Sequence, residues 1–298
     1  MPAVTGTPPT STVETQRGTV EFLDAGSGPA VLVVHGSPGG ADAGWLMAQF
    51  LVDAGFRVVV PSRPGYLGTP LTEATAPIDA QADLYAALLA ELGIPQVGVL
   101  CWSGGGPSTY RFAVRHPELV SSVAAVAAVS RRYEWHLGAD EKFAFGTRPG
   151  NWLISMLARH RPEQLISATL SSEGDLSKEQ LAELSAAVSA DPVQRQFVLQ
   201  LAGTVSHRGD RRAGVDNDMS TFAAIDSLQL DAIRVPVLLV QGDADSDVPP
   251  AYSDFAADQL PDATMVTVPE GTHLAAWASP AAAEVQSQIV AFLRAGGA

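Results

Sequence analysis

Short, uninterrupted apolar segments constrain the fold of this chain most strongly. Each is rich in β-branched residues and bounded by Gly or Pro, and they span residues 30–34, 56–60, 97–100, 120–129, 235–240 and 265–268. Strands that are apolar along their whole length are typical of a sheet buried on both faces. Ala-rich helical segments separate them, at residues 42–54, 77–92, 104–116 and 280–294. This alternation predicts an α/β fold with a mostly parallel central sheet and helices on both sides.

The alternation stops between residues 130 and 233, where no strand-like run occurs. Two helix starts can be recognised there. Ser177 followed by Gln180 predicts a capping box, and Asp191 before Pro192 predicts an N-cap followed by a first-turn proline. We therefore interpret the segment as a helical lid inserted between two strands of one sheet.

This interpretation divides the chain into a core and a lid. Residues 1–130 and 233–298 are expected to form the core, and residues 131–232 the lid. The Pro-, Thr- and Ser-rich residues 1–12 are expected to be a disordered tail. An edge hairpin with its turn at residues 26–28 is predicted to follow.

Composition excludes several classes of function. A net charge of −14 disfavours nucleic acid and anionic membrane surfaces as partners, because both require a basic surface. The single cysteine rules out an intrachain disulfide and a zinc site built from clustered cysteines. The N-terminal residues do not resemble a signal peptide, and no apolar run is long enough to span a membrane. We expect a cytoplasmic protein that acts on a small molecule; the sequence does not indicate its oligomeric state.

The segment after the third apolar run carries the strongest chemical signal. Residues 97–100 lead into the run Cys101-Trp102-Ser103-Gly104-Gly105-Gly106, and a helical pattern follows. This strand–turn–helix context is typical of a nucleophile elbow, in which a sharp turn exposes the serine hydroxyl at the edge of the sheet. The Gly104 amide at the helix N-terminus could then donate to a developing oxyanion. The alternative is a glycine-rich turn that only binds a ligand. Cys101 is expected to be a small buried apolar residue.

A second glycine-rich loop follows the first apolar run, with the sequence His35-Gly36-Ser37-Pro38-Gly39-Gly40. Parallel strands end at the same edge of a sheet, so this loop is expected near Ser103. The Ser37 amide is then a second candidate oxyanion donor, whereas His35 is expected to be a packing residue.

An acid and a base are available on later loops. Asp243, Asp245 and Asp247 follow residues 235–240, and His273 follows residues 265–268. A catalytic serine requires a histidine base that an acid orients, and His273 lies 28 residues after Asp245 (273 − 245) at the same predicted edge. The alternatives are a solvated acidic turn and a surface histidine.

These motifs together resemble the α/β-hydrolase superfamily, in which the nucleophile, acid and histidine follow one another in this order. The resemblance is to the lidded branch that holds esterases, proline iminopeptidases, haloperoxidase-like enzymes and C–C bond hydrolases. It implies Ser103 as nucleophile, His273 as base and Asp245 as the orienting acid, since Asp245 matches the family's Gly-x-x-Asp pattern from Gly242. It also implies the Ser37 and Gly104 amides as the oxyanion hole.

The expected activity is a serine hydrolase, most simply a carboxylesterase that works through an acyl-enzyme without metal or organic cofactor. Its substrate is expected to be small and largely apolar. Candidate substrate contacts are Trp102, Trp135, Trp152, Met156 and Phe222. Three alternatives remain open: a proline iminopeptidase-type aminopeptidase, a C–C bond hydrolase, and a non-catalytic ligand binder. The aminopeptidase would need an acid in the lid, for which the sequence offers Glu134, Glu141, Glu163, Glu173 and Asp218.

Overall fold

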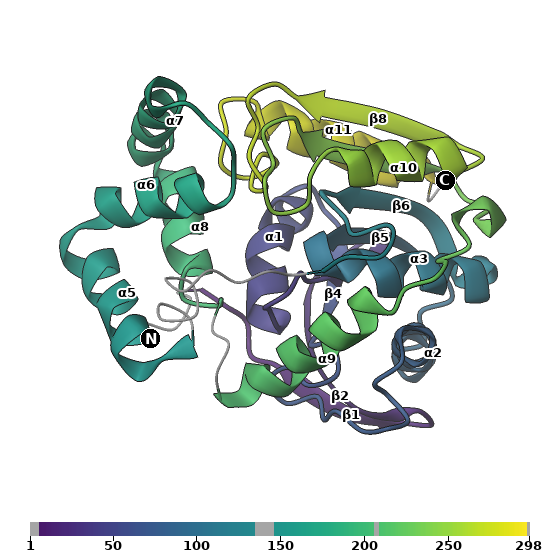
Figure 1. Ribbon diagram of the computed structural model, residues 1–298. Helices are drawn as coiled ribbons and strands as arrows, with labels where there is room; N and C mark the ends of the chain where they lie inside the picture. The colour runs from purple at the N-terminus through teal and green to yellow at the C-terminus, as the bar shows by residue number, and fades with distance from the viewer. Residues whose placement is uncertain (1–5, 135–145, 206–208, 297–298) are drawn as a thin grey trace.

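A twisted eight-stranded sheet forms the centre of the molecule in the computed structural model, which describes residues 6–134, 146–205 and 209–296 (Figure 1). The strand order is β1-β2-β4-β3-β5-β6-β7-β8. Strands β1 and β2 pair antiparallel with each other, β2 pairs antiparallel with β4, and every other neighbouring pair is parallel. The strands are β1 (Ser11–Thr15), β2 (Gly18–Gly26), β3 (Ala30–Val34), β4 (Arg57–Pro61), β5 (Val97–Trp102), β6 (Val120–Val126), β7 (Val237–Gly242) and β8 (Ala263–Val268).

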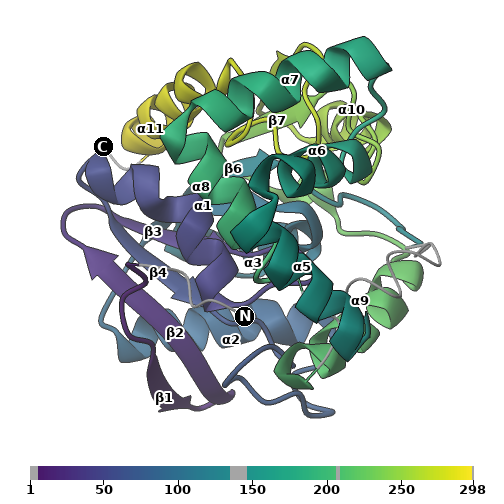
Figure 2. The same ribbon diagram turned by 90° about the vertical axis from the view of Figure 1, so that its left-hand side faces the viewer.

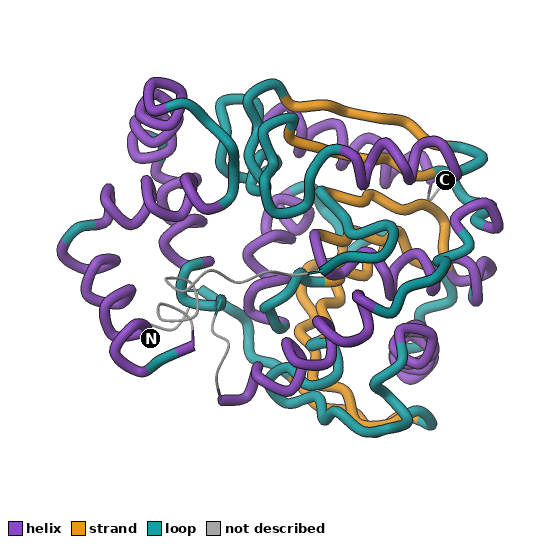
Figure 3. Tube along the Cα trace, viewed as in Figure 1, coloured by secondary structure: helices purple, strands orange, loops and turns teal. Residues whose placement is uncertain are grey.

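Helices cover both faces of the sheet, as Figure 3 shows. One face packs against α1 (Ala41–Asp53) and α11 (Ala282–Gly296), and the other against α2 (Ile78–Glu91), α3 (Gly106–Arg115) and α10 (Ala251–Gln259). Because each buried strand is apolar along its whole length, its alternate side chains can pack against the helices on both faces. In β3, Val31 and Val33 belong to the first layer of the core, and Leu32 and Val34 to the second. The predicted α/β architecture is therefore confirmed; the sequence reading omitted α10.

The helices of the insertion lie between β6 and β7 in the chain. They are α5 (Arg148–His160), α6 (Pro162–Ser172), α7 (Lys178–Ala190), α8 (Pro192–Leu201) and α9 (Arg212–Ala223). Both predicted caps are confirmed: Ser177 and Gln180 form a reciprocal capping box, and the Asp191 side chain accepts from the amides of Val193 and Gln194. Figure 2 shows α6, α7 and α8 gathered together, with α8 beside α1. Phe197 of α8 stacks on Trp277 of the core.

The N-terminal part differs from expectation in two ways. Strand β1 begins at Ser11, inside the segment expected to be a tail, because it pairs with β2 from Ser11 to Thr15. The predicted hairpin at residues 26–28 is wrong, because β2 pairs with β1 and β4 and not with β3, the strand that follows it in the chain. Gly26 ends β2 instead, where a Cβ would lie 2.2 Å from the carbonyl oxygen of Phe56. The glycine there permits a close backbone approach rather than a tight turn.

The parallel strands bring the functional loops together. The chain leaves the carboxyl ends of β3, β5, β7 and β8 into the segments that contain Ser37, Ser103, Asp245 and His273. Among the residues that the structure describes, no helix is both long and apolar enough to cross a membrane.

Candidate active site

Ser103 occupies a strained turn between β5 and the 3-10 turn Ser103–Gly105 that leads into α3. Its φ is 52°, a left-handed conformation that non-glycine residues rarely adopt. The turn leaves no room for side chains behind it. A Cβ on Gly105 would lie 2.5 Å from the carbonyl oxygen of Val34, and one on Gly106 would lie 2.5 Å from that of Val129. Backbone strain of this kind typically persists where a functional side chain must be presented.

Cys101 lies two residues before the serine and is buried, as predicted. Burial raises the pKa of its thiol to about 12, partly offset by a hydrogen bond to Thr109. The thiol is therefore neutral under ordinary conditions and is a poor nucleophile.

Asp245 and His273 form a buried pair. Nδ1 of His273 donates to Oδ2 of Asp245 at 2.8 Å, and both side chains are at most 1% exposed. The carboxylate is held by three further donors: the amides of Asp247 and Val248 at 3.0 and 2.9 Å, and the side-chain amide of Gln241 at 3.0 Å. Of the three carboxylates on this loop, Asp245 therefore has the orientation that the histidine requires, whereas Asp243 is exposed.

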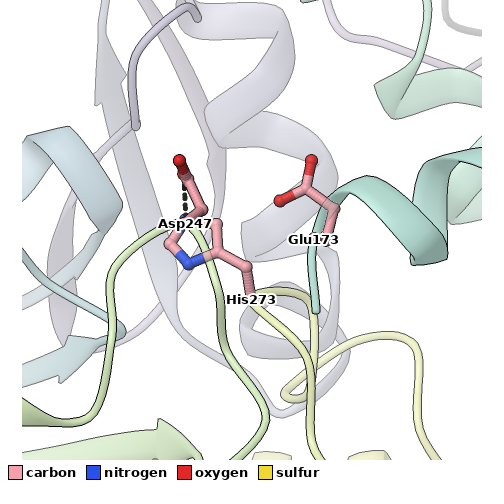
Figure 4. A group of neighbouring side chains, drawn as sticks. All are labelled: Glu173, Asp247 and His273. Atoms are coloured by element: carbon pink, nitrogen blue, oxygen red, sulfur yellow. Dashed lines mark ion pairs between the residues drawn. The ribbon is translucent and has the colours of Figure 1, made fainter. Parts of the chain in front are cut away.

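The other nitrogen of His273 faces a second carboxylate. Its Nε2 lies 3.4 Å from Oδ2 of Asp247, and Glu173 at the end of α6 completes a cluster whose ligand atoms lie within 4.8 Å of one another (Figure 4). Burial alone would lower the pKa of His273. Asp245 and Asp247, with a smaller effect of Glu173, outweigh burial and raise this pKa to about 10. Imidazole and carboxylates are also the groups that bind divalent cations, so this is where a metal ion would fit.

Within the described residues, Nε2 of His273 has no hydrogen-bond partner, so the bond to the Ser103 hydroxyl that a catalytic base forms is absent here. The ring itself is well positioned beside the elbow. It packs on Trp102, with centroids 4.9 Å apart, and the Trp102 indole donates to the backbone oxygen of His273 at 3.1 Å. Catalytic hydrogen bonds are often long or misaligned before substrate binds.

The loop of residues 35–40 lies directly against the elbow, as its place after β3 predicted. A Cβ on Gly36 would lie 3.1 Å from Cβ of Ser103, and one on Gly104 would lie 2.3 Å from Oγ of Ser37. The backbone segments that carry the Ser37 and Gly104 amides are therefore neighbours. His35 is buried: its Nδ1 donates to the carbonyl of Gly36 at 2.7 Å, and its Nε2 accepts from the amide of Arg63 at 2.9 Å. These contacts fit the expected packing role.

A buried polar network that the sequence analysis did not predict contacts this loop. Arg63, only 1% exposed, pairs with Asp218 of α9 at 2.6 Å, and the hydroxyls of Tyr66 and Ser37 also donate to Asp218. The signal available was an arginine inside the segment Ser62-Arg63-Pro64-Gly65. Its partner lies 155 positions away, so no local pattern connects the two.

A cavity of about 240 Å³ opens beside the cluster. Trp102 and Glu173 belong to its wall, and the remainder is mainly apolar side chains of α5, α6 and α8, including Leu153, Ile154, Leu157, Leu165 and Leu201. Trp102 thus lies where a substrate contact was expected. Phe222 is not part of this cavity wall but lies beside the elbow, with its ring edge 3.1 Å from where a Cβ of Gly104 would be.

Two expected substrate contacts lie outside this cavity wall. Trp152 and Met156 are 64% and 36% exposed and lie one helical turn apart on the outer side of α5. The side of α5 that carries Ile154 and Leu157 faces the cavity instead. Both sides of this helix carry large apolar residues, so composition did not reveal which side turns inward. Trp135 lies outside the described residues.

The family model for the alpha/beta hydrolase fold matches residues 29–280. The chain belongs to the α/β-hydrolase family. This α/β-hydrolase is 28% identical over 292 residues to an uncharacterized hydrolase, YcgS, of Bacillus subtilis, with 95% of this chain and 97% of the relative covered. It is also 28% identical, over 82% of this chain and 91% of the relative, to a pimeloyl-[acyl-carrier protein] methyl ester esterase of Aromatoleum aromaticum.

Solved structures agree with this assignment. The α/β-hydrolase superposes on an alpha/beta hydrolase fold protein from Nakamurella multipartita with a TM-score of 0.93 and 52% identity, covering 97% of this chain and 100% of that one. An esterase from Thermogutta terrifontis, at 22% identity and a TM-score of 0.66, shares the fold. The predicted superfamily is confirmed, and the protein is a hydrolase with esterase-like relatives.

Proposed function

We propose that this hydrolase cleaves a carboxylic ester of a small, largely apolar substrate through a covalent acyl-enzyme on Ser103. The observation that carries the proposal is the buried hydrogen bond of 2.8 Å between Asp245 and His273, made beside the strained turn that presents Ser103. A histidine oriented by an acid next to a serine at the carboxyl edge of the sheet is the arrangement that activates a hydroxyl for acyl transfer.

In the proposed mechanism, His273 turns its Nε2 from Asp247 toward the Ser103 hydroxyl when substrate enters. It accepts the hydroxyl proton as Oγ attacks the ester carbonyl, and Asp245 stabilises the imidazolium that forms. The Ser37 and Gly104 amides donate to the oxyanion, each contributing about 10²–10³ in rate. His273 then protonates the departing alcohol, and water attacks the acyl-enzyme in the same way.

The cavity supports the choice of substrate class. At about 240 Å³ it is below the usual 300–1,000 Å³ of ligand pockets, which favours a small acyl or alcohol group. Its wall is mostly apolar, and the carboxylate of Glu173 in that wall, together with Asp247 in the same cluster, disfavours anionic esters. The esterase named among the relatives supports an ester bond as the target.

A second candidate is an aminopeptidase of the proline iminopeptidase type. The observation in its favour is Glu173, a carboxylate in the cavity wall and within 4.8 Å of His273, where it could pair with a substrate ammonium group. Turnover of a prolyl-nitroanilide above that of uncharged nitrophenyl esters would favour this candidate over the esterase.

The test is hydrolysis of short-chain nitrophenyl esters by the wild type and three variants. Ser103→Ala should abolish turnover, and Asp245→Asn should lower kcat by about 10⁴. Asp243→Asn, on the same loop but exposed, is the matched control and should behave as wild type. Full activity of folded Ser103→Ala, or no labelling of Ser103 by a fluorophosphonate, would end the proposal; the latter would favour a ligand binder.

Loss of activity with EDTA and its recovery with a divalent ion would point to the metal-binding alternative at His273.

A further inference from the structure

Asp218 accepts four hydrogen bonds, as many as Asp245, although it belongs to the insertion and not to the sheet. Its Oδ1 accepts from Nη1 of Arg63 at 2.9 Å. Its Oδ2 accepts from Nη2 of Arg63 and from the Tyr66 hydroxyl, both at 2.6 Å, and from the Ser37 hydroxyl. Asp218 and Arg63 are each 1% exposed, so the whole charge pair is removed from water.

The network ends on the loop that carries a proposed oxyanion donor. Nη2 of Arg63 donates to Oγ of Ser37 at 2.6 Å and to the carbonyl of Gly36 at 3.2 Å. Oγ of Ser37 therefore accepts from Arg63 and donates to Asp218, which fixes its rotamer from both sides. Since a Cβ on Gly104 would lie only 2.3 Å from that oxygen, the fixed Ser37 side chain also determines how closely the loop approaches the elbow.

Helix α9 is held to the core by its backbone as well. The amide of Gly214 donates to the carbonyl of Gly65 at 2.9 Å, and a Cβ on Gly65 would lie 2.4 Å from the nitrogen of Gly214. Just before α9, Arg211 pairs with Asp42 at 2.6 Å and donates to the carbonyl of Gly39 in the same loop. In packing terms α9 therefore belongs with the sheet domain rather than with α5–α8.

A buried ion pair is weak support for stability as such, because desolvation of both charges offsets their attraction. Its more specific effect is to fix the positions of the groups that it bonds. Four donors converging on one carboxylate define one position of Ser37 relative to α9.

We propose that Asp218 is a positioning residue for the oxyanion hole: through Arg63 and the Ser37 hydroxyl, helix α9 holds the Ser37 amide in place for the transition state. This inference rests on the proposed function for its kinetic consequence, but not for its structural one. Because the oxyanion exists only after attack, misplacing the amide should reduce kcat and leave KM nearly unchanged.

The experiment compares kcat, KM and thermal stability of four proteins with the wild type. Ser37→Ala removes only the hydroxyl link and keeps the amide, and we expect kcat to fall about 10-fold with little change in KM or Tm. Asp218→Asn should lower both kcat and Tm, because Arg63 then keeps a buried, uncompensated charge. Asp83→Asn is the matched control. Asp83 also holds an arginine, Arg115 at 2.8 Å, but its partners Arg17, Arg115 and His116 lie outside residues 35–40, so kcat should stay unchanged.

A triple variant separates position from stability. Arg63→Met, Tyr66→Phe and Asp218→Leu together replace the network with apolar groups of similar size, which should recover Tm relative to Asp218→Asn. We expect kcat to remain at least about 10-fold below wild type, since the loop has lost its fixed attachment. If the triple variant recovered both kcat and Tm, the inference would be overturned. A wild-type kcat in Ser37→Ala would overturn it as well.

Hydrogen exchange provides a readout that does not depend on activity. Peptides that cover residues 35–40 should exchange faster in Ser37→Ala and in the triple variant than in the wild type. In the control Asp83→Asn they should exchange at the wild-type rate. Unchanged exchange in both variants would also contradict the inference. If the wild type hydrolyses no ester, the proposed function fails alone, and the exchange data still decide whether Asp218 holds the loop.

Discussion

Nε2 of His273 lies 3.4 Å from Oδ2 of Asp247, while Nδ1 of the same ring hydrogen-bonds to Asp245 at 2.8 Å. The imidazole is thus flanked by two carboxylates, and together with Glu173 they raise its pKa to about 10 against the opposing effect of burial. Below this pKa the ring is protonated and is no base. This arrangement favours the charged form of the histidine, and its Nε2 makes no hydrogen bond to the serine that it is proposed to activate.

Activity should therefore rise with pH. Since the raised pKa keeps His273 protonated at neutral pH, kcat/KM for an uncharged ester should increase toward a midpoint near pH 10. Asp247→Asn removes one of the carboxylates that raise this pKa, so the midpoint should move down by about one unit or more. The measurement is a pH–rate profile on a substrate that does not itself titrate.

The exposed Asp243 provides the control for this profile, because it lies on the same loop but is not one of the carboxylates that raise the pKa of His273. Asp243→Asn should leave the midpoint where the wild type has it. A wild-type profile already at its plateau by pH 7, or identical midpoints for Asp247→Asn and wild type, would show that Asp247 does not govern the base.

Gly105→Ala should destabilise the elbow itself. The added Cβ would lie 2.5 Å from the carbonyl oxygen of Val34 and 2.9 Å from that of His35, and backbone atoms cannot move aside cheaply. We expect a loss of about 1–3 kcal/mol, seen as a lower Tm, with reduced kcat as the loop of residues 35–40 is displaced. Gly146→Ala, whose Cβ would meet no atom within 4 Å, is the control. Equal Tm values for the two variants would contradict the crowding seen behind Ser103.

Cys101 should be unreactive in the folded protein. Burial raises the pKa of its thiol to about 12, so below that pH the thiolate is scarce as well as shielded. Native protein at pH 8 should take up no thiol reagent, whereas the unfolded chain should react at its single cysteine. Stoichiometric modification of native protein, measured by intact mass, would mean that the elbow strand opens readily.

Leu157→Ala should widen substrate choice toward longer chains. Leu157 lies in the cavity wall and is only half-buried, so truncating it enlarges the cavity with a modest loss of stability. Each extra methylene that becomes buried should increase relative kcat/KM by a factor of about 4, equivalent to about 0.8 kcal/mol. Val193→Ala on α8, 78% exposed and outside the cavity, should keep the wild-type preference. An unchanged chain-length profile in Leu157→Ala would show that the substrate chain does not bind in this cavity.

Local patterns were sufficient to predict most of the fold. Six strands, the capping box at Ser177 and the turn at Ser103 follow from apolar runs, cap chemistry and glycine spacing, all of which act within a few residues. The rule that parallel strands share an edge then brought the loops of Ser37, Ser103, Asp245 and His273 to one side. The hairpin was mispredicted at Gly26 because a glycine signals an unusual backbone position without saying whether a turn or a close approach requires it.

The remaining features were decided by tertiary structure, because each depends on the mutual orientation of distant side chains. Composition could not determine which side of α5 turns toward the cavity, and so Trp152 was expected where Leu157 lies. Nor could it indicate that Nε2 of His273 faces Asp247. The pairing of Arg63 with Asp218 spans 155 positions, and burial of both charges is tolerable only because the folded chain surrounds them with partners. Local chemistry thus supplied the candidate groups, and long-range packing determined how they are held.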